Sequence, residues 1–267
     1  MPGQKNMKKL KNDSLLCVGL DSDLDLIPKK FLDSKTPQYD FNRYIIEQTH
    51  QYVTAYKPNL AFYEARGSQG WQELALTMKY LQINHPNIFT IADAKRADIG
   101  STNKGYIRAI FDELNFDAIT LHPYLGKEAL KPFLDRQDKT SIILCHTSNP
   151  GAGELQDLKI DGKNLWEVVA EKVSQDWNAN SNCMLVVGAT YPQEMTRVRE
   201  IVGNMTLLVP GIGAQGGDLQ AVMRIGLNKK RAGLIINSSR GIIFSNNPKL
   251  EAEKLNDEIE KYRIEAV

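Results

Sequence analysis

One short segment of the sequence carries charge at a spacing that suits acid–base chemistry. In IADAKRADIGST, Asp93, Lys95 and Asp98 lie within six residues. Residues two apart in a strand point to the same side, so Asp93 and Lys95 can face one cavity. A second lysine, Lys57, follows another apolar run in the segment YKPN. The four side chains are therefore candidates for an alternating lysine–aspartate array.

Such an array would serve a reaction in which charge develops. Each carboxylate would keep its neighbouring ammonium protonated and so make a lysine a positioned acid. A carboxylate close to an anionic substrate group would also destabilise the ground state. The alternative interpretation is a structural ion-pair network or a solvated loop, because a DxKxxD pattern is short and chance matches are common.

Two glycine-containing segments near the C-terminus indicate a phosphate site. PGIGAQGGD (residues 210–218) precedes a helical segment, and NSSRG ends in Arg240 and Gly241. Exposed backbone N–H groups at such a turn suit a phosphate, which an arginine can bind bidentately. A plain helix-entry turn is the alternative for the glycines.

The remaining polar candidates carry weaker signals. HTSNPGAGE (residues 146–154) contains Ser148, but no GxSxG elbow surrounds it, so a serine nucleophile is not expected. The four histidines show neither HxH nor HxxxH spacing, and no metal site is predicted. We expect each of them to be a hydrogen-bonded structural residue. They are His50, His85, His122 and His146.

Eight short apolar runs must position these residues. They are rich in β-branched side chains and mostly do not alternate, as expected of strands buried on both faces. They are Leu15–Leu20, Tyr52–Lys57, Ile88–Ala92, Ala118–Leu121, Ser141–Cys145, Cys183–Val187, Thr206–Val209 and Gly233–Ile236.

A segment with helical spacing follows each run. These segments are Phe41–Tyr52, Gly70–Ile83, Ser101–Leu114, Lys127–Leu134, Lys163–Trp177, Pro192–Val202, Asp218–Gly226 and Lys249–Arg263. Ser101 or Thr102 is expected to cap the third, and Asp218 the seventh. Eight strand–helix units predict a single α/β (β/α)8 barrel, in which functional side chains stand at the carboxyl ends of the strands. An open doubly wound sheet is disfavoured because GLDSDLDLIP, after the first run, lacks a GxGxxG turn.

Composition excludes several classes. The 267 residues carry 33 basic and 32 acidic side chains, a net charge of +1, so no nucleic-acid partner is expected. No apolar run approaches a membrane span, and no membrane partner is expected. Three dispersed cysteines, Cys17, Cys145 and Cys183, fit buried thiols in a reducing cytoplasm. We expect residues 1–12 to be a flexible tail and residues 13–267 to be the barrel.

Taken together, DAKRADIGST, YKPN, HTSNPGAGE, PGIGAQGGD and NSSRG resemble the orotidine 5′-phosphate decarboxylase family, most closely its longer-chain bacterial branch. The resemblance covers nearly the whole chain except the tails. It implies the cofactor-free conversion of orotidine 5′-monophosphate into uridine 5′-monophosphate and CO2, the last step of UMP synthesis. It also implies a cytoplasmic homodimer.

The same resemblance implies a role for each site residue. Lys95 would protonate C6 of the pyrimidine, and Asp93 would lie against the departing carboxylate. Lys57 and Asp21 would contact the ribose, and Ser148 the pyrimidine ring. Asp98 and Thr102 would reach the partner subunit's site. The phosphate would be held by Gln215, Arg240 and the Gly241 amide, with residues 213–217 as a closing loop.

Two alternatives stay open at this level. One is a Mg²⁺-dependent phosphosugar decarboxylase or synthase of the same superfamily, which holds its metal partly with an acidic residue at the end of strand two, where this chain has Lys57. Another is a non-catalytic nucleotide-binding barrel. A second fused activity is not expected, because the eight units use nearly all residues.

Overall fold

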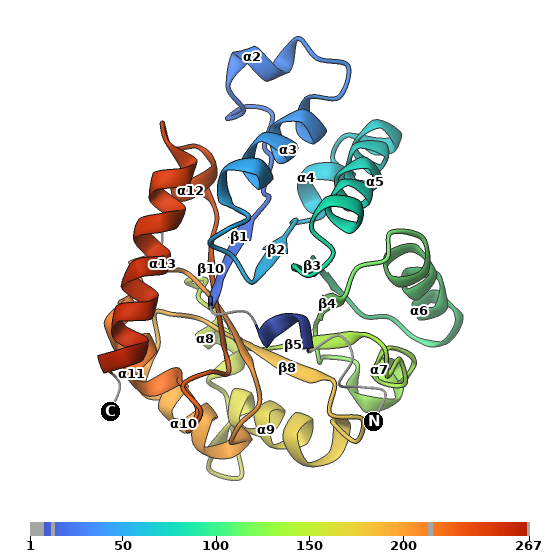
Figure 1. Ribbon diagram of the computed structural model, residues 1–267. Coiled ribbons are helices and arrows are strands. Elements are labelled where there is room, and N and C mark those ends of the chain that lie inside the picture. Colours follow the sequence, from blue (N-terminus) through green and yellow to red (C-terminus); the bar gives the residue numbers. More distant parts are fainter. Residues whose placement is uncertain (1–7, 12–13, 213–215, 266–267) are drawn as a thin grey trace.

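Eight parallel strands form a closed barrel, which confirms the predicted (β/α)8 fold. The computed structural model describes residues 8–11, 14–212 and 216–265. Around the barrel the strands follow the order β1-β10-β9-β8-β5-β4-β3-β2, and Figure 1 shows the helices surrounding them. The strands are β1 Leu16–Gly19, β2 Ala55–Lys57, β3 Phe89–Arg96, β4 Ala118–Leu121, β5 Thr140–His146, β8 Cys183–Val187, β9 Leu207–Pro210 and β10 Leu234–Ser238.

Each predicted helical segment overlaps an observed helix. Two of them end in a π-helical turn, η2 (Arg108–Glu113) and η3 (Val173–Trp177). The main helices are α3 Pro37–Thr49, α5 Gly67–Asn84, α6 Gly100–Ile107, α7 Gly126–Leu134, α9 Leu165–Lys172, α10 Pro192–Val202, α11 Leu219–Gly226 and α13 Pro248–Glu265.

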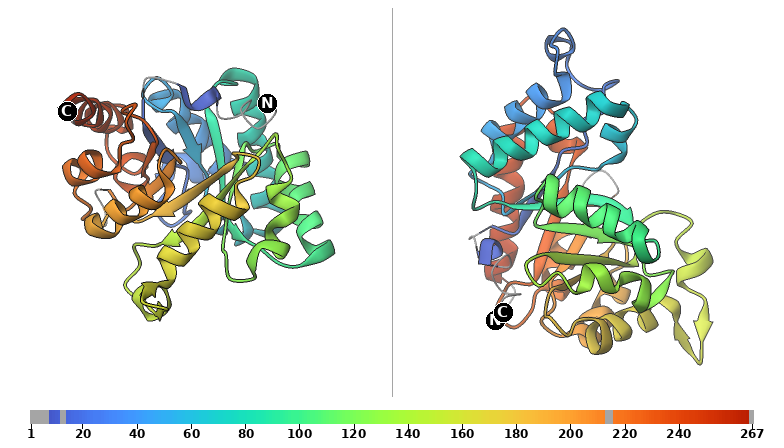
Figure 2. Two further views of the ribbon diagram at one scale, coloured as in Figure 1. Left: turned by 90° about the horizontal axis from the view of Figure 1, so that it is seen from below. Right: turned by 90° about the vertical axis from the view of Figure 1, so that its right-hand side faces the viewer.

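Additional short elements decorate the carboxyl ends of the strands. The sequence pattern did not predict them because each is too short to show a hydrophobic period. These short elements are α2 Lys29–Leu32, α4 Ala61–Glu64, α8 Gly153–Gln156, β6 Lys159–Ile160, β7 Lys163–Asn164 and α12 Arg240–Ile243. Strands β6 and β7 form a hairpin, which stands out from the barrel body in Figure 2.

The strands lack alternation because both of their faces are covered. On β1, Cys17 packs into the barrel interior with Ile91 and Met184, whereas its neighbours Leu16 and Val18 pack into the larger cluster that includes the helices. Apolar side chains on both faces are what a barrel strand needs, and this explains the continuous apolar runs in the sequence.

One of the two predicted helix caps is confirmed and the other is not. Asp218 caps α11 as expected, since its Oδ1 accepts the Ala221 N–H at 3.0 Å. The prediction for α6 was wrong. That helix begins at Gly100, whose positive φ of 49° makes the turn, so Ser101 and Thr102 lie inside its first turn and are exposed.

Part of the N-terminal segment packs against the end of the barrel. Residues Lys8–Lys11 form a short 3-10 helix, η1. The Lys9 Nζ donates to both carboxylate oxygens of the buried Asp117, at 3.0 and 2.9 Å, and Leu10 packs against the barrel-interior cluster. Charge pairing and apolar contact therefore order these four residues of the segment expected as a tail; residues 1–7 and 12 lie outside the described residues.

The three cysteines are buried and free, as predicted. Burial raises the pKa of each thiol, Cys17, Cys145 and Cys183, to about 12. At pH 8 about one thiol in 10⁴ is then a thiolate, the reactive form. We expect a thiol reagent to label none of them in the native protein and all three after unfolding, as measured by intact mass. Rapid native labelling of any one would contradict this packing.

Within the described part of the chain, no helix is both long enough and apolar enough to cross a membrane.

Candidate active site

A lysine–aspartate–lysine array stands at the carboxyl ends of β2 and β3. Asp93 is its centre, with Lys57 Nζ at 2.8 Å from Oδ2 and Lys95 Nζ at 2.6 Å from Oδ1. The Lys57 and Asp93 side chains are only 6% and 11% exposed, whereas that of Lys95 is 52% exposed. One cation is therefore fixed inside the barrel end, and the other is open to a ligand.

Lys95 reaches Asp93 through an irregular backbone. The pairing of β3 with β4 shifts register between Ala92 and Arg96, and Lys95 has a positive φ of 46°. Positive φ is uncommon for a residue with a Cβ and is found where surrounding structure imposes it, often at functional sites. The two side chains thus converge as predicted, but a bulge brings them together and simple strand alternation does not.

The charges within the array hold one another in the ionised state. Burial alone would raise the pKa of Asp93, but Lys57 and Lys95 outweigh it and hold that pKa well below its ordinary value. Burial alone would lower the pKa of Lys57, but Asp93 and Asp21 raise it well above its ordinary value. A lowered carboxyl pKa and a raised ammonium pKa keep Asp93 and Lys57 charged across the neutral range.

Thr120, at the end of β4, also contacts the array, and sequence reasoning missed it. Its hydroxyl donates to Asp93 Oδ1 at 2.9 Å and accepts the Lys95 backbone N–H at 2.9 Å. The side chain is buried. The available signal was its place near the end of the fourth apolar run, but a threonine in a β-strand is too common to stand out.

Backbone contacts between neighbouring strands fix the positions of the two lysine-bearing strand ends. The Asp93 N–H donates to the Pro58 carbonyl at 3.0 Å, and the Leu60 N–H donates to the Asp93 carbonyl at 3.2 Å. The Leu20 N–H donates to the Lys57 carbonyl at 3.1 Å. The ends of β1, β2 and β3 are therefore joined directly beneath the charged side chains.

Asp21 lies at the end of β1 close to this array. Its charge contributes to the raised pKa of Lys57. Its Oδ1 is buried and accepts no hydrogen bond from the residues that the structure describes. A buried carboxylate oxygen without a hydrogen bond is energetically costly.

Asp98 and Thr102 do not join the array within one chain. The Asp98 carboxylate accepts the N–H of the adjacent Ile99 at 2.7 Å, and within the described ranges it makes no hydrogen bond to Lys57, Asp93 or Lys95. Thr102 is exposed in the first turn of α6. The four-membered array expected from the sequence therefore has three members in this chain.

The predicted phosphate-binding residues follow β10. Arg240 and Gly241 are exposed and open α12, directly after the strand and Ser239. A side chain at Gly19 would approach Ser239 Cβ to 2.7 Å, so the glycine lets this turn lie against β1. Gln215 and most of the predicted closing loop lie outside the described residues.

Ser148 is half-buried after β5, and Gly188 lies behind it. A Cβ at Gly188 would be 2.8 Å from Ser148 Cβ and 2.9 Å from its backbone nitrogen, so only glycine fits. This close approach fixes where the predicted pyrimidine contact stands.

Two of the four histidines, His122 and His146, make the expected hydrogen bonds. His122 Nε2 lies 3.1 Å from the Ala97 carbonyl, and His146 Nε2 lies 3.2 Å from Asp157 Oδ1. The prediction was wrong for His50 and His85: within the described residues their rings make no hydrogen bond, and they contact each other in a tilted arrangement, with ring centroids 4.5 Å apart.

Comparison with known proteins places this site in a family. The model of the orotidine 5′-phosphate decarboxylase / HUMPS family matches residues 14–255. The orotidine 5′-phosphate decarboxylase of Christiangramia forsetii is 49% identical over 244 residues, 91% of this chain and 89% of that protein. That of Bacteroides fragilis is 47% identical over 241 residues, 90% of this chain and 86% of that protein.

The fold agrees with that of a solved OMP decarboxylase structure. The OMP decarboxylase of Leishmania donovani has a TM-score of 0.88 and 39% identity, covering 99% of this chain and all of that one. The residues matched by the family model include Lys57, Asp93, Lys95 and Arg240. The chain therefore belongs to the orotidine 5′-phosphate decarboxylase / HUMPS family.

Proposed function

We propose that this protein decarboxylates orotidine 5′-monophosphate to uridine 5′-monophosphate without a cofactor, as the last step of UMP synthesis. The observation that carries the proposal is the array of Lys57, Asp93 and Lys95, with one buried and one exposed cation on a single carboxylate. Its simplest test is the absorbance change when purified protein meets orotidine 5′-monophosphate without added metal. No change at micromolar enzyme would overturn the proposal.

The array suits a reaction that leaves an electron pair on carbon. The C6–carboxylate bond breaks, CO2 departs, and the bonding pair remains on C6. The Lys95 ammonium stabilises that developing charge and then gives its proton to C6, which leaves a neutral lysine to be reprotonated from solvent. Asp93, ionised at neutral pH, lies against the substrate carboxylate and favours its loss.

The remote groups of the substrate supply binding energy. Asp21 and Lys57 contact the ribose, Ser148 contacts the pyrimidine, and the phosphate is bound by Gln215, Arg240 and the Gly241 amide. Binding energy from non-reacting groups can offset the cost of closing the site and compressing its reacting end.

Arg240→Ala should therefore chiefly weaken substrate binding. Loss of a charge-assisted contact to phosphate costs about 1.5–3 kcal/mol, so KM should rise about 10- to 100-fold. Steady-state kinetics check this, with the exposed Arg231→Ala, in the turn before β10, as the matched control. An unchanged KM would mean that Arg240 does not hold the phosphate.

Thr120→Val should lower kcat about tenfold. Valine keeps the shape of threonine, but it removes the hydroxyl that donates to Asp93 and accepts the Lys95 N–H, a loss of about 1–2 kcal/mol. Thr120→Ser keeps the hydroxyl and should restore most of the rate. Equal kcat values in the valine and serine variants would show that packing alone matters at this position.

A magnesium-dependent phosphosugar decarboxylase or synthase of the same superfamily is the alternative function. Lys57 argues against it, because its Nζ occupies Asp93 Oδ2 at 2.8 Å and would repel a divalent cation from that oxygen. Full activity in excess chelator separates the two functions, and loss of activity that only Mg²⁺ restores would favour this second one.

We also propose a homodimer in which Asp98 and Thr102 complete the partner subunit's site. Support comes from exposed apolar side chains next to Asp98: Ile99 is 60% and Tyr124 84% exposed. Their loops adjoin, because His122 Nε2 lies 3.1 Å from the Ala97 carbonyl. A second copy would remove this apolar surface from water.

The three free cysteines support a reducing compartment, and we propose the cytoplasm.

A further inference from the structure

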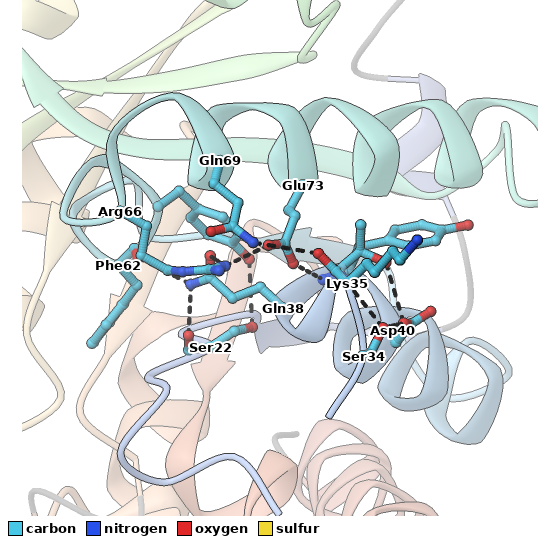
Figure 3. Close-up of polar contacts among 12 residues, drawn as sticks. Ser22, Ser34, Lys35, Gln38, Asp40, Phe62, Arg66, Gln69 and Glu73 are labelled. Carbon is cyan, nitrogen blue, oxygen red and sulfur yellow. Dashed lines mark hydrogen bonds and ion pairs between the residues drawn. The ribbon is translucent and has the colours of Figure 1, made fainter. Parts of the chain in front are cut away.

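A buried polar network joins the segment after β1 to α3, α4 and α5, and Figure 3 shows the part of it around Ser22, Gln38 and Glu73. Its side chains are at most 1% exposed, although each carries polar atoms. Burying so many polar groups is tolerated only when they are hydrogen-bonded, and a satisfied network holds its members in one arrangement. Those members are Ser22, Gln38, Asn42, Tyr63, Glu73 and Thr77.

The network binds the backbone on both sides of Asp21. Tyr63 Oη donates to the Leu20 carbonyl at 2.9 Å, and Gln38 Nε2 donates to the Ser22 carbonyl at 2.8 Å. The Ser22 hydroxyl donates in turn to Asn42 Oδ1. The residues before and after Asp21 are therefore each held by a side chain from another element.

The Gln38 amide is itself held in place. Its Oε1 accepts Arg66 Nη1 at 2.9 Å, and Arg66 pairs with Glu73 at 2.5 Å. The second Glu73 oxygen accepts the Tyr39 N–H in the first turn of α3 at 3.0 Å. Figure 3 shows this chain of contacts running from Glu73 through Arg66 and Gln38 to Ser22. The orientation of the amide is thus fixed by an ion pair that is largely removed from water.

The Tyr63 hydroxyl is oriented in the same way. It accepts Asn42 Nδ2 at 2.8 Å, and the same amide donates to Thr77 Oγ1 at 3.0 Å. Tyr63 belongs to α4, which packs on α5 so closely that a Cβ at Gly70 would lie 2.0 Å from the Tyr63 carbonyl. With its acceptor role used by Asn42, the hydroxyl proton is directed at Leu20.

We propose that Tyr63 and Gln38 are positioning residues that fix Asp21 in the orientation that binds the substrate ribose. Asp21 needs such support, because within the described chain its buried Oδ1 has no hydrogen-bond partner to orient it. Asp21 also lies near enough to Lys57 for its charge to raise the pKa of that lysine, so the position of the carboxylate bears on the array as well. Fixing the backbone on both sides of the residue holds its side chain at a defined distance. The inference rests on the proposed function through the ribose contact of Asp21.

Tyr63→Phe is the sharpest test, because it removes one oxygen atom. We expect KM for orotidine 5′-monophosphate to rise about tenfold, with kcat within about twofold of the wild type. A contact with the ribose acts in the ground state and in the transition state alike, so its loss weakens binding without slowing the chemical step. The tenfold change corresponds to about 1.4 kcal/mol, which is within the range for one hydrogen bond.

Tyr56→Phe is the matched control. The Tyr56 hydroxyl is equally buried and bonds Thr49 Oγ1 at 2.7 Å and the Ile46 carbonyl at 3.2 Å. Those partners lie in the last turn of α3, and neither is part of the backbone beside Asp21. We expect this variant to lower Tm as Tyr63→Phe does and to leave KM unchanged. A comparable rise of KM in both variants would mean that general loosening is responsible, and would overturn the proposal.

A double-mutant cycle with Asp21→Ala tests the route of the effect. If Tyr63 acts through Asp21, Tyr63→Phe should not raise KM further in the Asp21→Ala background. A second tenfold rise there would overturn the proposal. Gln38→Met removes the donor to the Ser22 carbonyl, and we expect it to raise KM in the same way as Tyr63→Phe. It replaces Tyr63→Phe in this test if that variant does not fold. If KM is unchanged in Asp21→Ala while the wild-type enzyme decarboxylates its substrate, the positioning role is refuted and the proposed function stands. If the wild-type enzyme does not decarboxylate the substrate, the proposed function itself fails, so the two failures are distinguishable.

Discussion

Lys95→Ala should lower kcat for orotidine 5′-monophosphate by at least about 10⁴-fold. Two contributions disappear together. The variant loses the cation that stabilises the charge developing on C6, and a stabilising group of this kind contributes about 10²–10³-fold. It also loses the acid that protonates the carbon, which contributes about 10²–10⁴-fold. Lys57 cannot take over, since it is buried and bound to the opposite oxygen of Asp93.

The fold should survive this substitution. The Lys95 side chain is half exposed, and Asp93 keeps its bonds to Lys57 and Thr120. We therefore expect Tm to change little, which separates lost chemistry from lost structure. Lys104→Ala, which removes an exposed lysine from the neighbouring α6, is the matched control and should retain full activity. Near-normal turnover by the Lys95→Ala variant would refute the assigned chemistry.

The barrel could be predicted because both faces of its strands are covered. A strand such as β1, with Cys17 turned inward and Leu16 outward, must be apolar throughout, and this gives a continuous run that is easy to recognise. The runs in turn locate the strand ends, and the fold requires functional groups to stand there. This route predicts Asp93, Lys95 and Lys57 as site residues from the sequence alone.

The geometry of the array could not be predicted in the same way. The bulge at Lys95 depends on how β3 pairs with β4, and Thr120, which receives the Lys95 N–H, lies 25 residues further along the chain. Neither the pairing of β3 with β4 nor the contact with Thr120 changes the sequence pattern around Lys95. The same holds for Gln38 and Tyr63, which sequence reasoning did not consider, because a buried polar side chain reads as a surface one until its partners are known.

The position of Asp98 predicts that two inactive variants recover activity when their chains form a mixed dimer. If Asp98 completes the partner subunit's site, Asp98→Asn and Lys95→Ala should each inactivate their own homodimer, by at least about 10²-fold for Asp98→Asn. In a heterodimer of the two, one site would combine both defects. The other would contain an intact Lys95 and receive an intact Asp98 from the Lys95→Ala chain.

Co-expression of these two variants should therefore restore about a quarter of wild-type activity, because random pairing makes half of the dimers heterodimers and each has one intact site. Activity per heterodimer, isolated with two different affinity tags, should be half that of the wild type. Lys95→Ala with Asp93→Asn is the matched control, since Lys95 and Asp93 pair within one chain at 2.6 Å and no heterodimer of these variants contains an intact site. If Asp98 instead served its own chain, the first mixture would be as inactive as the control. The two arrangements thus differ by the whole recovered activity, and the contacts of Asp98 favour recovery: its carboxylate bonds the adjacent Ile99 N–H and, within the described chain, none of the three array residues.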